Sequence, residues 1–141
     1  MLKNKQLSIA LFVLSLCLPT FSSQAHDATT VYGFEALLLG SIQVLLALVI
    51  SLSDYSVGLL LVIPWLANIT WFMSLVMSKS KNRLILSVIS TLFVALFFIQ
   101  PITMIGEAGS SIDLQLLIGA YIWGLSLIVP ILGELMKVRS N

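Results

Sequence analysis

Four long apolar runs, separated by short polar segments, dominate the chain after its first 25 residues. They cover residues 32–52, 57–77, 84–105 and 114–136. Each is close to the roughly 20 residues that an α-helix needs to cross a bilayer, and the tight turn at 53–56 forces the first two runs into an antiparallel pair. The pattern therefore predicts an all-α fold, an integral membrane four-helix bundle made of two antiparallel helical hairpins, with residues 26–141 as a single transmembrane domain.

Prolines interrupt three of these runs. Pro64 and Pro130 lie inside the second and fourth runs, where the missing N–H leaves a backbone carbonyl unpaired and predicts a helix kink. The residue before a proline is disfavoured in a helix. Regular helix in the third run is therefore expected to end near Gln100, although the apolar stretch reaches Ile105.

The composition favours a membrane protein and argues against other classes. Hydrophobic residues make up 59% of the chain and charged residues 9%, whereas a soluble domain carries about 25% charged residues. So few charged side chains could not coat a surface in water, and we expect the lipid bilayer to be the main partner. The net charge of +1 argues against nucleic-acid binding, which needs a clustered basic surface.

Residues 1–25 have the three parts of a secretory signal peptide. Lys3 and Lys5 form the basic start, and an apolar stretch covers residues 7–18. Ser23 and Ala25 supply the two small residues that a signal peptidase recognises. The apolar stretch is shorter than a membrane-crossing helix needs. We therefore expect cleavage after Ala25, with a retained anchor helix as the alternative.

The basic segment 78–83 and the basic tail 137–141 make the orientation in the membrane contradictory. Positively charged loops stay in the cytoplasm, which places both segments inside. A signal peptide delivers residue 26 to the outside, and four crossings then place both segments outside, whether or not the first helix is removed. We favour the signal peptide, because its three parts agree in order and size.

Polar side chains lie at mid-depth in the first two runs. Gln43 belongs to a face of small residues in the first run, and Asn68 and Thr70 follow Pro64 in the second. An unpaired amide in hydrocarbon costs several kcal/mol, so both amides need partners. They could line a pore or a substrate path, but hydrogen bonds between packed helices are the interpretation that we favour.

Groups suited to catalysis are sparse in this chain. The longest internal loop carries the carboxylates of Glu107 and Asp113 without a neighbouring histidine or cysteine, and the single cysteine, Cys17, lies in the segment expected to be removed. Glu134 and Lys137, three residues apart, are expected to form an ion pair at the end of the fourth helix. No spacing is typical of a metal site, an activated nucleophile or a phosphate-binding loop, so we expect no catalytic site, cofactor or metal.

Three short motifs carry a resemblance. They are Trp65-Leu66-Ala67-Asn68 in the second run, Glu107-Ala108-Gly109 in the loop, and Gly119-Ala120-Tyr121-Ile122-Trp123 at the start of the last run. Together they resemble small bacterial membrane proteins of no known activity. The resemblance implies a four-helix, multi-pass protein of the bacterial cell inner membrane and implies no reaction.

The leading functional hypothesis is an accessory, regulatory or interaction protein that is held together by helix packing. Its partner would be another membrane protein or a second copy of the chain. The alternative is a subunit of an oligomeric channel or transporter that uses Gln43, Asn68 and the kinks at Pro64 and Pro130. An enzyme is the least supported class, because no group of reactive residues stands together in the sequence.

Overall fold

The computed structural model describes residues 2–23, 30–50, 55–105 and 111–140. The backbone alone is described at residues 2–3, 23, 46, 48, 50, 55–60, 102–105, 111–113 and 137–140. The helices in these ranges are α1 (Leu2–Leu16), α2 (Gly33–Ile50), α3 (Tyr55–Val76), α4 (Ser80–Ile99) and α5 (Ile118–Ser140). The strands are β1 (Pro19–Ser23), β2 (Thr30–Tyr32), β3 (Ile102–Ile105) and β4 (Ser111–Leu116).

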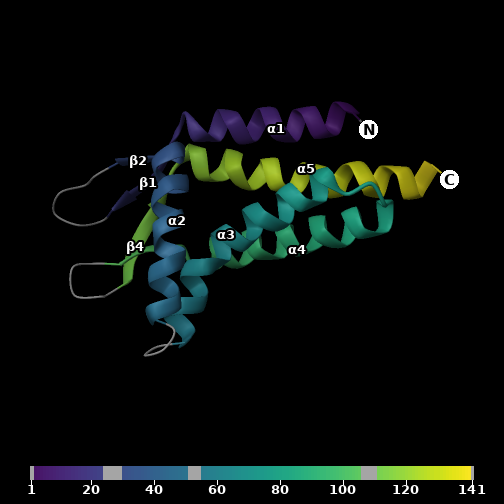
Figure 1. Cartoon of the computed structure of the whole chain (residues 1–141). Helices are drawn as coiled ribbons and strands as arrows, with labels where there is room; N and C mark the ends of the chain where they lie inside the picture. The colour runs from purple at the N-terminus through teal and green to yellow at the C-terminus, as the bar shows by residue number, and fades with distance from the viewer. Residues whose placement is uncertain (1, 24–29, 51–54, 106–110, 141) are drawn as a thin grey trace.

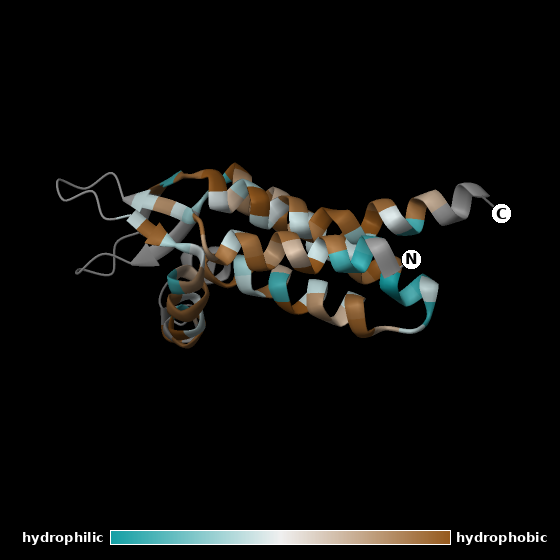
Figure 2. Cartoon of the chain, turned by 90° about the horizontal axis from the view of Figure 1, so that it is seen from above, coloured by the Kyte–Doolittle hydropathy of each residue, from teal (hydrophilic) through white to brown (hydrophobic). Residues whose placement is uncertain are grey.

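Most of the helices share one direction, but α2 does not. Helices α1, α4 and α5 and the second part of α3 lie alongside one another, whereas α2 lies across them (Figure 1). In the turned view of Figure 2, α2 is seen nearly end-on beside the same bundle. The strands gather at the end where α2 lies, which we call the sheet end. The other end holds both chain termini and the turn between α3 and α4, and we call it the turn end.

Helix α3 changes direction along its length, first beside α2 and then beside α4 (Figure 1). Pro64 lies inside this helix and cannot donate to the carbonyl of Leu60, which is the cause of the kink predicted there. The bend lets one helix join the crossing helix to the bundle. Helix α5 continues through Pro130 without interruption.

A small antiparallel sheet makes the all-α prediction wrong in part. The strand order is β2-β1-β4-β3, with Phe21 of β1 opposite Leu116 of β4 and Ile102 of β3 opposite Asp113. Pairing supplies partners for backbone N–H and C=O groups that would otherwise lie unpaired beside apolar helices. The pairing brings the start of the chain to its last third, so no local pattern in the sequence indicates it.

The helix of the third run ends near Gln100, as predicted, whereas the fourth run is helical only from Ile118 onward. Helix α4 ends at Ile99, where the N–H of Gln100 donates to the carbonyl of Leu96 at 3.2 Å, and the next residues form β3. Residues 114–116 belong to β4, so α5 begins only at Ile118. By length and composition, two helical stretches in the described ranges could cross a membrane, Ser80–Ile99 and Ile118–Met136.

Residues 2–23 are packed into the fold. Helix α1 lies along α5, and β1 pairs with both β2 and β4. Gly33 allows α2 to start against this segment, because a Cβ there would overlap the Ser15 carbonyl and lie 2.7 Å from Leu16 Cα. The expected cleavage position after Ala25 lies outside the described residues, and cleavage stays a prediction.

The interior of the bundle contains many small polar side chains. Most of the largest fully buried side chains are serines, namely Ser8, Ser15, Ser74, Ser87, Ser90 and Ser126. Large apolar side chains such as Phe72 and Leu92 point outward at the same time. Small residues at helix contacts and large ones outside are typical of packing in a bilayer, where apolar burial does not drive helices together.

Candidate functional site

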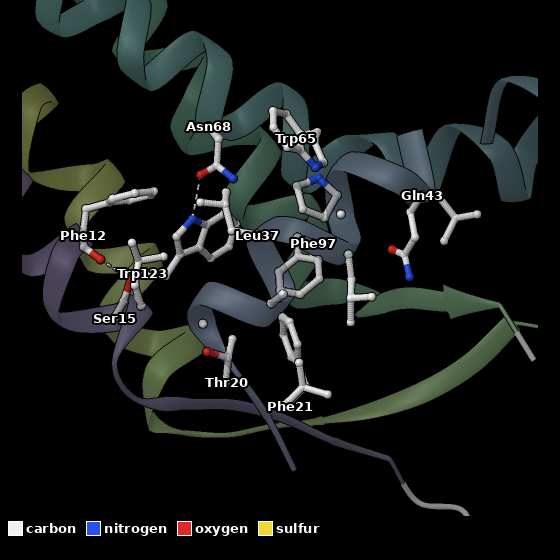
Figure 3. Close-up of a pocket in the computed structure, with 18 residues that line it drawn as sticks. Phe12, Ser15, Thr20, Phe21, Leu37, Gln43, Trp65, Asn68, Phe97 and Trp123 are labelled. Atoms are coloured by element: carbon white, nitrogen blue, oxygen red, sulfur yellow. Dashed lines mark hydrogen bonds between the residues drawn. The ribbon is translucent and has the colours of Figure 1, made fainter. Parts of the chain in front are cut away.

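A pocket lies at the sheet end, where side chains of all five helices meet those of β1 and β2 (Figure 3). The centre of a water molecule could move through about 70 Å³ of it, and one water needs only about 10–15 Å³ by that measure. The aromatic residues in its wall are Phe12, Phe21, Trp65, Phe97 and Trp123. The polar side chains in the wall are those of Ser15, Thr20, Gln43, Trp65, Asn68 and Trp123.

Asn68 joins two of the helices around the pocket. Its Oδ1 accepts a hydrogen bond of 2.8 Å from Trp123 Nε1, so α3 and α5 are linked through side chains (Figure 3). The contact is an interhelical hydrogen bond of the kind that the sequence favoured for a mid-depth amide. The Trp123 ring also meets Phe97 of α4 edge to face, with ring centroids 5.5 Å apart.

Gly40 and Trp65 form the opposite side of the pocket. A Cβ at position 40 would lie 2.7 Å from Trp65 Nε1, so only glycine lets the indole lie against α2. That nitrogen is buried and has no hydrogen-bond partner in the described part of the chain. Gln43, one turn further along α2, also lines the pocket. The Gln43 amide and the Trp65 indole therefore place hydrogen-bonding groups in a mostly apolar wall.

The other residues singled out in the sequence are divided between the pocket and the rest of the molecule. Pro64 lines the pocket. Thr70 is not among the lining residues. Its hydroxyl donates within α3 to the carbonyls of Leu66 and Ala67, at 2.7 and 3.1 Å. Pro130 is buried in α5 away from the pocket lining.

The loop carboxylates do not meet in a described site. Glu107 lies outside the described residues, and Asp113 is described only as a backbone position in β4, opposite Ile102. Across residues 2–23, 30–50, 55–105 and 111–140, no group of three or more histidine, cysteine or acidic side chains could hold a metal.

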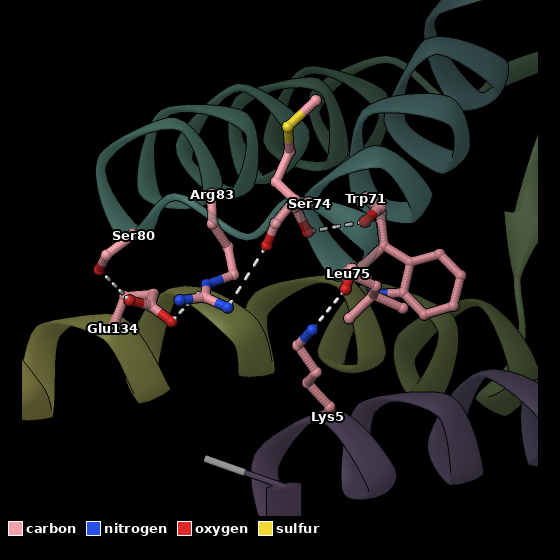
Figure 4. A network of polar contacts seen from close by, with 8 residues as sticks. Lys5, Trp71, Ser74, Leu75, Ser80, Arg83 and Glu134 are labelled. Atoms are coloured by element: carbon pink, nitrogen blue, oxygen red, sulfur yellow. Dashed lines mark hydrogen bonds and ion pairs between the residues drawn. The ribbon is translucent and has the colours of Figure 1, made fainter.

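A polar cluster closes the turn end of the bundle (Figure 4). Arg83 Nε lies 2.7 Å from Glu134 Oε1, and each side chain keeps 6% of its surface exposed. Ser80 donates to the other carboxylate oxygen of Glu134 at 2.7 Å, and Arg83 Nη1 reaches the Met77 carbonyl at 3.5 Å. The sequence paired Glu134 with Lys137, whose side chain is not described. That pairing therefore stays a prediction. The described partners of Glu134 come from the start of α4, which sequence spacing could not indicate.

Sequence reasoning also missed the polar contacts of α1. Ser8 donates to the carbonyl of Ser126 in α5 at 2.7 Å and accepts from Trp71 Nε1 in α3 at 2.9 Å. The Lys5 ammonium donates to the Leu75 carbonyl (Figure 4). Phe12 stacks on Trp71 with ring centroids 4.5 Å apart. Helix α1 is therefore joined to α3 and α5 by both polar and aromatic contacts.

Comparison with protein-family models, curated proteins and solved structures finds no match for this chain. The resemblance to small bacterial inner-membrane proteins therefore stays a prediction.

Proposed function

We propose that this chain is a small multi-pass integral membrane protein of a bacterial inner membrane that acts as an accessory, regulatory or interaction protein. One observation carries the proposal: six serines are buried among the apolar side chains of the interior, while many leucine, isoleucine, valine and phenylalanine side chains are exposed on the outside. In water this arrangement would expose a large apolar surface and bury polar groups. In lipid it removes both costs, because small residues and interhelical hydrogen bonds are what hold helices together there.

The accessory role is supported by how the polar groups inside the bundle are used. Ser90 donates to the Ala67 carbonyl at 3.0 Å, and Ser8 and Asn68 each take part in a contact between helices. Groups that hydrogen-bond one another serve to position helices rather than to react with a substrate. We therefore assign the protein no reaction, and its exposed apolar helix faces are the surfaces on which a membrane partner would pack.

Washing isolated membranes with alkaline carbonate tests the membrane location. We expect the full chain to stay with the membrane pellet and to be released only by detergent. Release by carbonate would contradict the proposal, because that treatment removes peripheral proteins and leaves crossing helices in place.

Purification through a C-terminal tag in a mild detergent tests the accessory role. We expect a second membrane protein to be retained at a constant ratio to the tagged chain, as measured by quantitative mass spectrometry. A lone chain or a lone homo-oligomer would contradict it. The homo-oligomer would support the second candidate described next.

The second candidate function is a pocket-based channel or carrier subunit. Gln43, Asn68 and Pro64 line one pocket, so the amides and the kink that suggested a pathway do lie together. Vesicles containing the purified protein should then pass a small solute faster than protein-free vesicles. Gln43→Leu should lower that rate, and Ser41→Leu on the exposed side of α2 should not. Equal rates with and without protein would remove this candidate.

A further inference from the structure

We propose that α1 stays in the mature protein as a membrane-crossing helix and that the turn end lies in the cytoplasm, against anionic lipid headgroups. This inference rests on the membrane location proposed above and adds an orientation to it. It also replaces the signal-peptide interpretation of residues 1–25 with a structural role for α1.

All the positive charge of the chain belongs to the turn end. The seven Lys and Arg residues occur only at residues 3–5, 79–83 and 137–139. These segments are the start of α1, the turn into α4 with its first residues, and the last part of α5. Figures 1 and 2 both place these three parts of the backbone at the same end of the bundle. Contacts of Lys5 with Leu75 and of Ser80 with Glu134 tie them together.

The sheet end has the opposite character. No Lys or Arg occurs in residues 6–78 or 84–136. The described acidic residues at this end are Glu35, which accepts the Tyr32 N–H at 2.8 Å, and Asp113 in β4. Open sheet edges do not occur in the hydrocarbon of a bilayer, because their backbone groups would lack partners. The edge strands β2 and β3 therefore place the sheet end in a headgroup layer or in water.

The crossing position of α2 removes the conflict between the topology signals. If α2 crossed the membrane, the segment 78–83 and the N-terminus of α1 would lie on opposite sides. Because α2 lies across the bundle, we take α1, α4, α5 and the second part of α3 as the crossing segments. Four crossings return both termini and the turn before α4 to one side. The positive-inside rule then places all three basic segments in the cytoplasm.

Helices α4 and α5 are long enough for this arrangement, whereas α1 is shorter than the hydrocarbon core. Helices α4 and α5 have 20 and 23 residues, or about 30 and 35 Å at a rise of about 1.5 Å per residue. Helix α1 has 15 residues, about 22 Å. The chain then enters β1, which belongs to the sheet end outside the hydrocarbon. Helix α1 therefore crosses alone, and the bilayer thins around it, as it does around helices shorter than its core of about 30 Å.

Helix α2 turns an apolar face away from the rest of the protein. Most of its exposed apolar side chains form one face, made by Phe34, Leu38, Ile42, Leu45 and Val49. Helices that lie in the interface turn such a face toward the acyl chains. The other side of α2 carries Gly40, Gln43 and Ala47 and packs on the rest of the protein.

The contacts of α1 argue that it is part of the finished protein. Its loss would leave the Trp71 indole N–H without the Ser8 acceptor and would remove the stacked ring of Phe12. A signal segment that is cut off needs no partners in the protein it delivers. The buried hydroxyl and the stacked ring of α1 have such partners in α3 and α5.

Reporter fusions at the C-terminus test the orientation on the full chain. A fluorescent protein that folds only in the cytoplasm should fluoresce, and a phosphatase that is active only after export should stay inactive. The opposite pair of signals would overturn the proposal, because four crossings at 32–52, 57–77, 84–105 and 114–136 place the C-terminus outside. Membrane integration itself is read by carbonate washing, so failure of the orientation and failure of the membrane location are distinguishable.

The single cysteine provides a test of whether α1 is retained. Cys17 lies just after α1, so it remains only if residues 1–25 are not removed. After the membranes are dissolved in SDS, a maleimide-linked polymer should shift the chain on a gel, and Cys17→Ser should abolish the shift. An unshifted wild-type chain would overturn the proposal.

A designed cross-link tests the contact of α1 with α5 in the membrane. An ideal Cβ at Gly133 would lie 3.3 Å from Asn4 Cβ, close to the separation of about 3.5–4.5 Å found in disulfides. Asn4→Cys with Gly133→Cys, in a Cys17→Ser chain, should form an internal disulfide when the membranes are treated with an oxidant. Asn4→Cys with Leu132→Cys is the control, because Leu132 is exposed on another side of α5. Equal cross-linking of both pairs, or of neither, would contradict the packing.

Lipid analysis tests the headgroup contact. Lys79 and Lys81 are exposed at the turn end, and charged lipids are attracted to basic segments beside a membrane. The protein purified in mild detergent should carry at least about twice as much anionic phospholipid per chain as Lys79→Gln/Lys81→Gln. Equal amounts in the two preparations would contradict contact with anionic headgroups.

Discussion

The turn end and the sheet end of the bundle accommodate buried polar groups in different ways. At the turn end, Arg83 and Glu134 are nearly fully buried, and each has a charged partner 2.7 Å away. At the sheet end, the pocket keeps free space beside the Gln43 amide and the buried Trp65 indole. A charge that lies inside must be paired, whereas a neutral amide or indole can remain next to a cavity at lower cost. The turn end is therefore suited to fixing the helices, whereas the sheet end keeps a pocket beside neutral polar groups.

Breaking the ion pair should have the largest effect. Glu134→Ala leaves the buried Arg83 guanidinium unpaired, and such changes cost about 3–5 kcal/mol of stability. We expect a marked fall in the thermal unfolding temperature of the protein in detergent. Replacing both residues, as Arg83→Leu with Glu134→Leu, should restore most of the loss, because a packed apolar pair carries no unpaired charge. If the single variant were as stable as the wild type, the turn end would not depend on this pair.

Adding a methyl group at Gly33 should cause the next largest loss of stability. Gly33→Ala places a Cβ against the backbone of Ser15 and Leu16, and overpacking of this kind costs about 1–3 kcal/mol. The same thermal unfolding measurement should show a clear loss. Gly133→Ala is the control, because its Cβ would meet the side chain of Asn4, which can move aside. An equal response of both variants would mean that α1 and the start of α2 do not meet as described.

Removing the Asn68 amide tests the sheet end directly. Asn68→Leu leaves Trp123 Nε1 without its acceptor, and a buried unpaired donor costs about 1–3 kcal/mol. Adding Trp123→Phe removes the donor as well, so the double variant should be more stable than the sum of the two single changes predicts. A double-mutant cycle measured by thermal unfolding checks this. Strict additivity would contradict the hydrogen bond.

The smallest expected effect is at Ser8. Ser8→Ala removes the acceptor of Trp71 and the donor to Ser126, and interhelical hydrogen bonds in membranes are worth about 0.6 kcal/mol on average and up to about 1.7. Ser41→Ala is a matched control, because its hydroxyl is exposed and bonds within its own helix at 3.0 Å. Thermal unfolding should detect the first change and not the second. A loss of stability in Ser41→Ala but not in Ser8→Ala would contradict the interhelical contacts of Ser8.

Local sequence patterns were reliable where a single property decides the structure. The apolar runs indicated helices, and Pro101 correctly indicated that α4 ends near Gln100. The small-residue face of the first run turned inward, with Gly40 and Gln43 lining the pocket. Helix period and proline geometry act over a few residues, so they can be read from the order of residues alone.

Contacts between distant segments could not be predicted in this way. Residues 102–105 and 114–116 lie at the ends of the apolar runs, yet they form strands because β4 pairs with β1 and β3. The sequence also carried no sign that Arg83 meets Glu134 from the start of α4. Of the pocket, the sequence indicated the residues Gln43, Asn68 and Pro64 as candidates but not that they share one wall with Trp65 and Trp123.

The sequence by itself determined the apolar helices, the low charge and the three separate basic segments, because these depend on composition and local order. Tertiary structure alone decided that α2 lies across the bundle, that residues 2–23 pack with α3 and α5, and that a sheet closes one end. The physical reason is that an apolar helix can satisfy its own backbone in any orientation, so its sequence does not specify what it packs against. The packing partners are determined by contacts between small residues and by long-range hydrogen bonds. These contacts also bring the three basic segments to one end of the molecule.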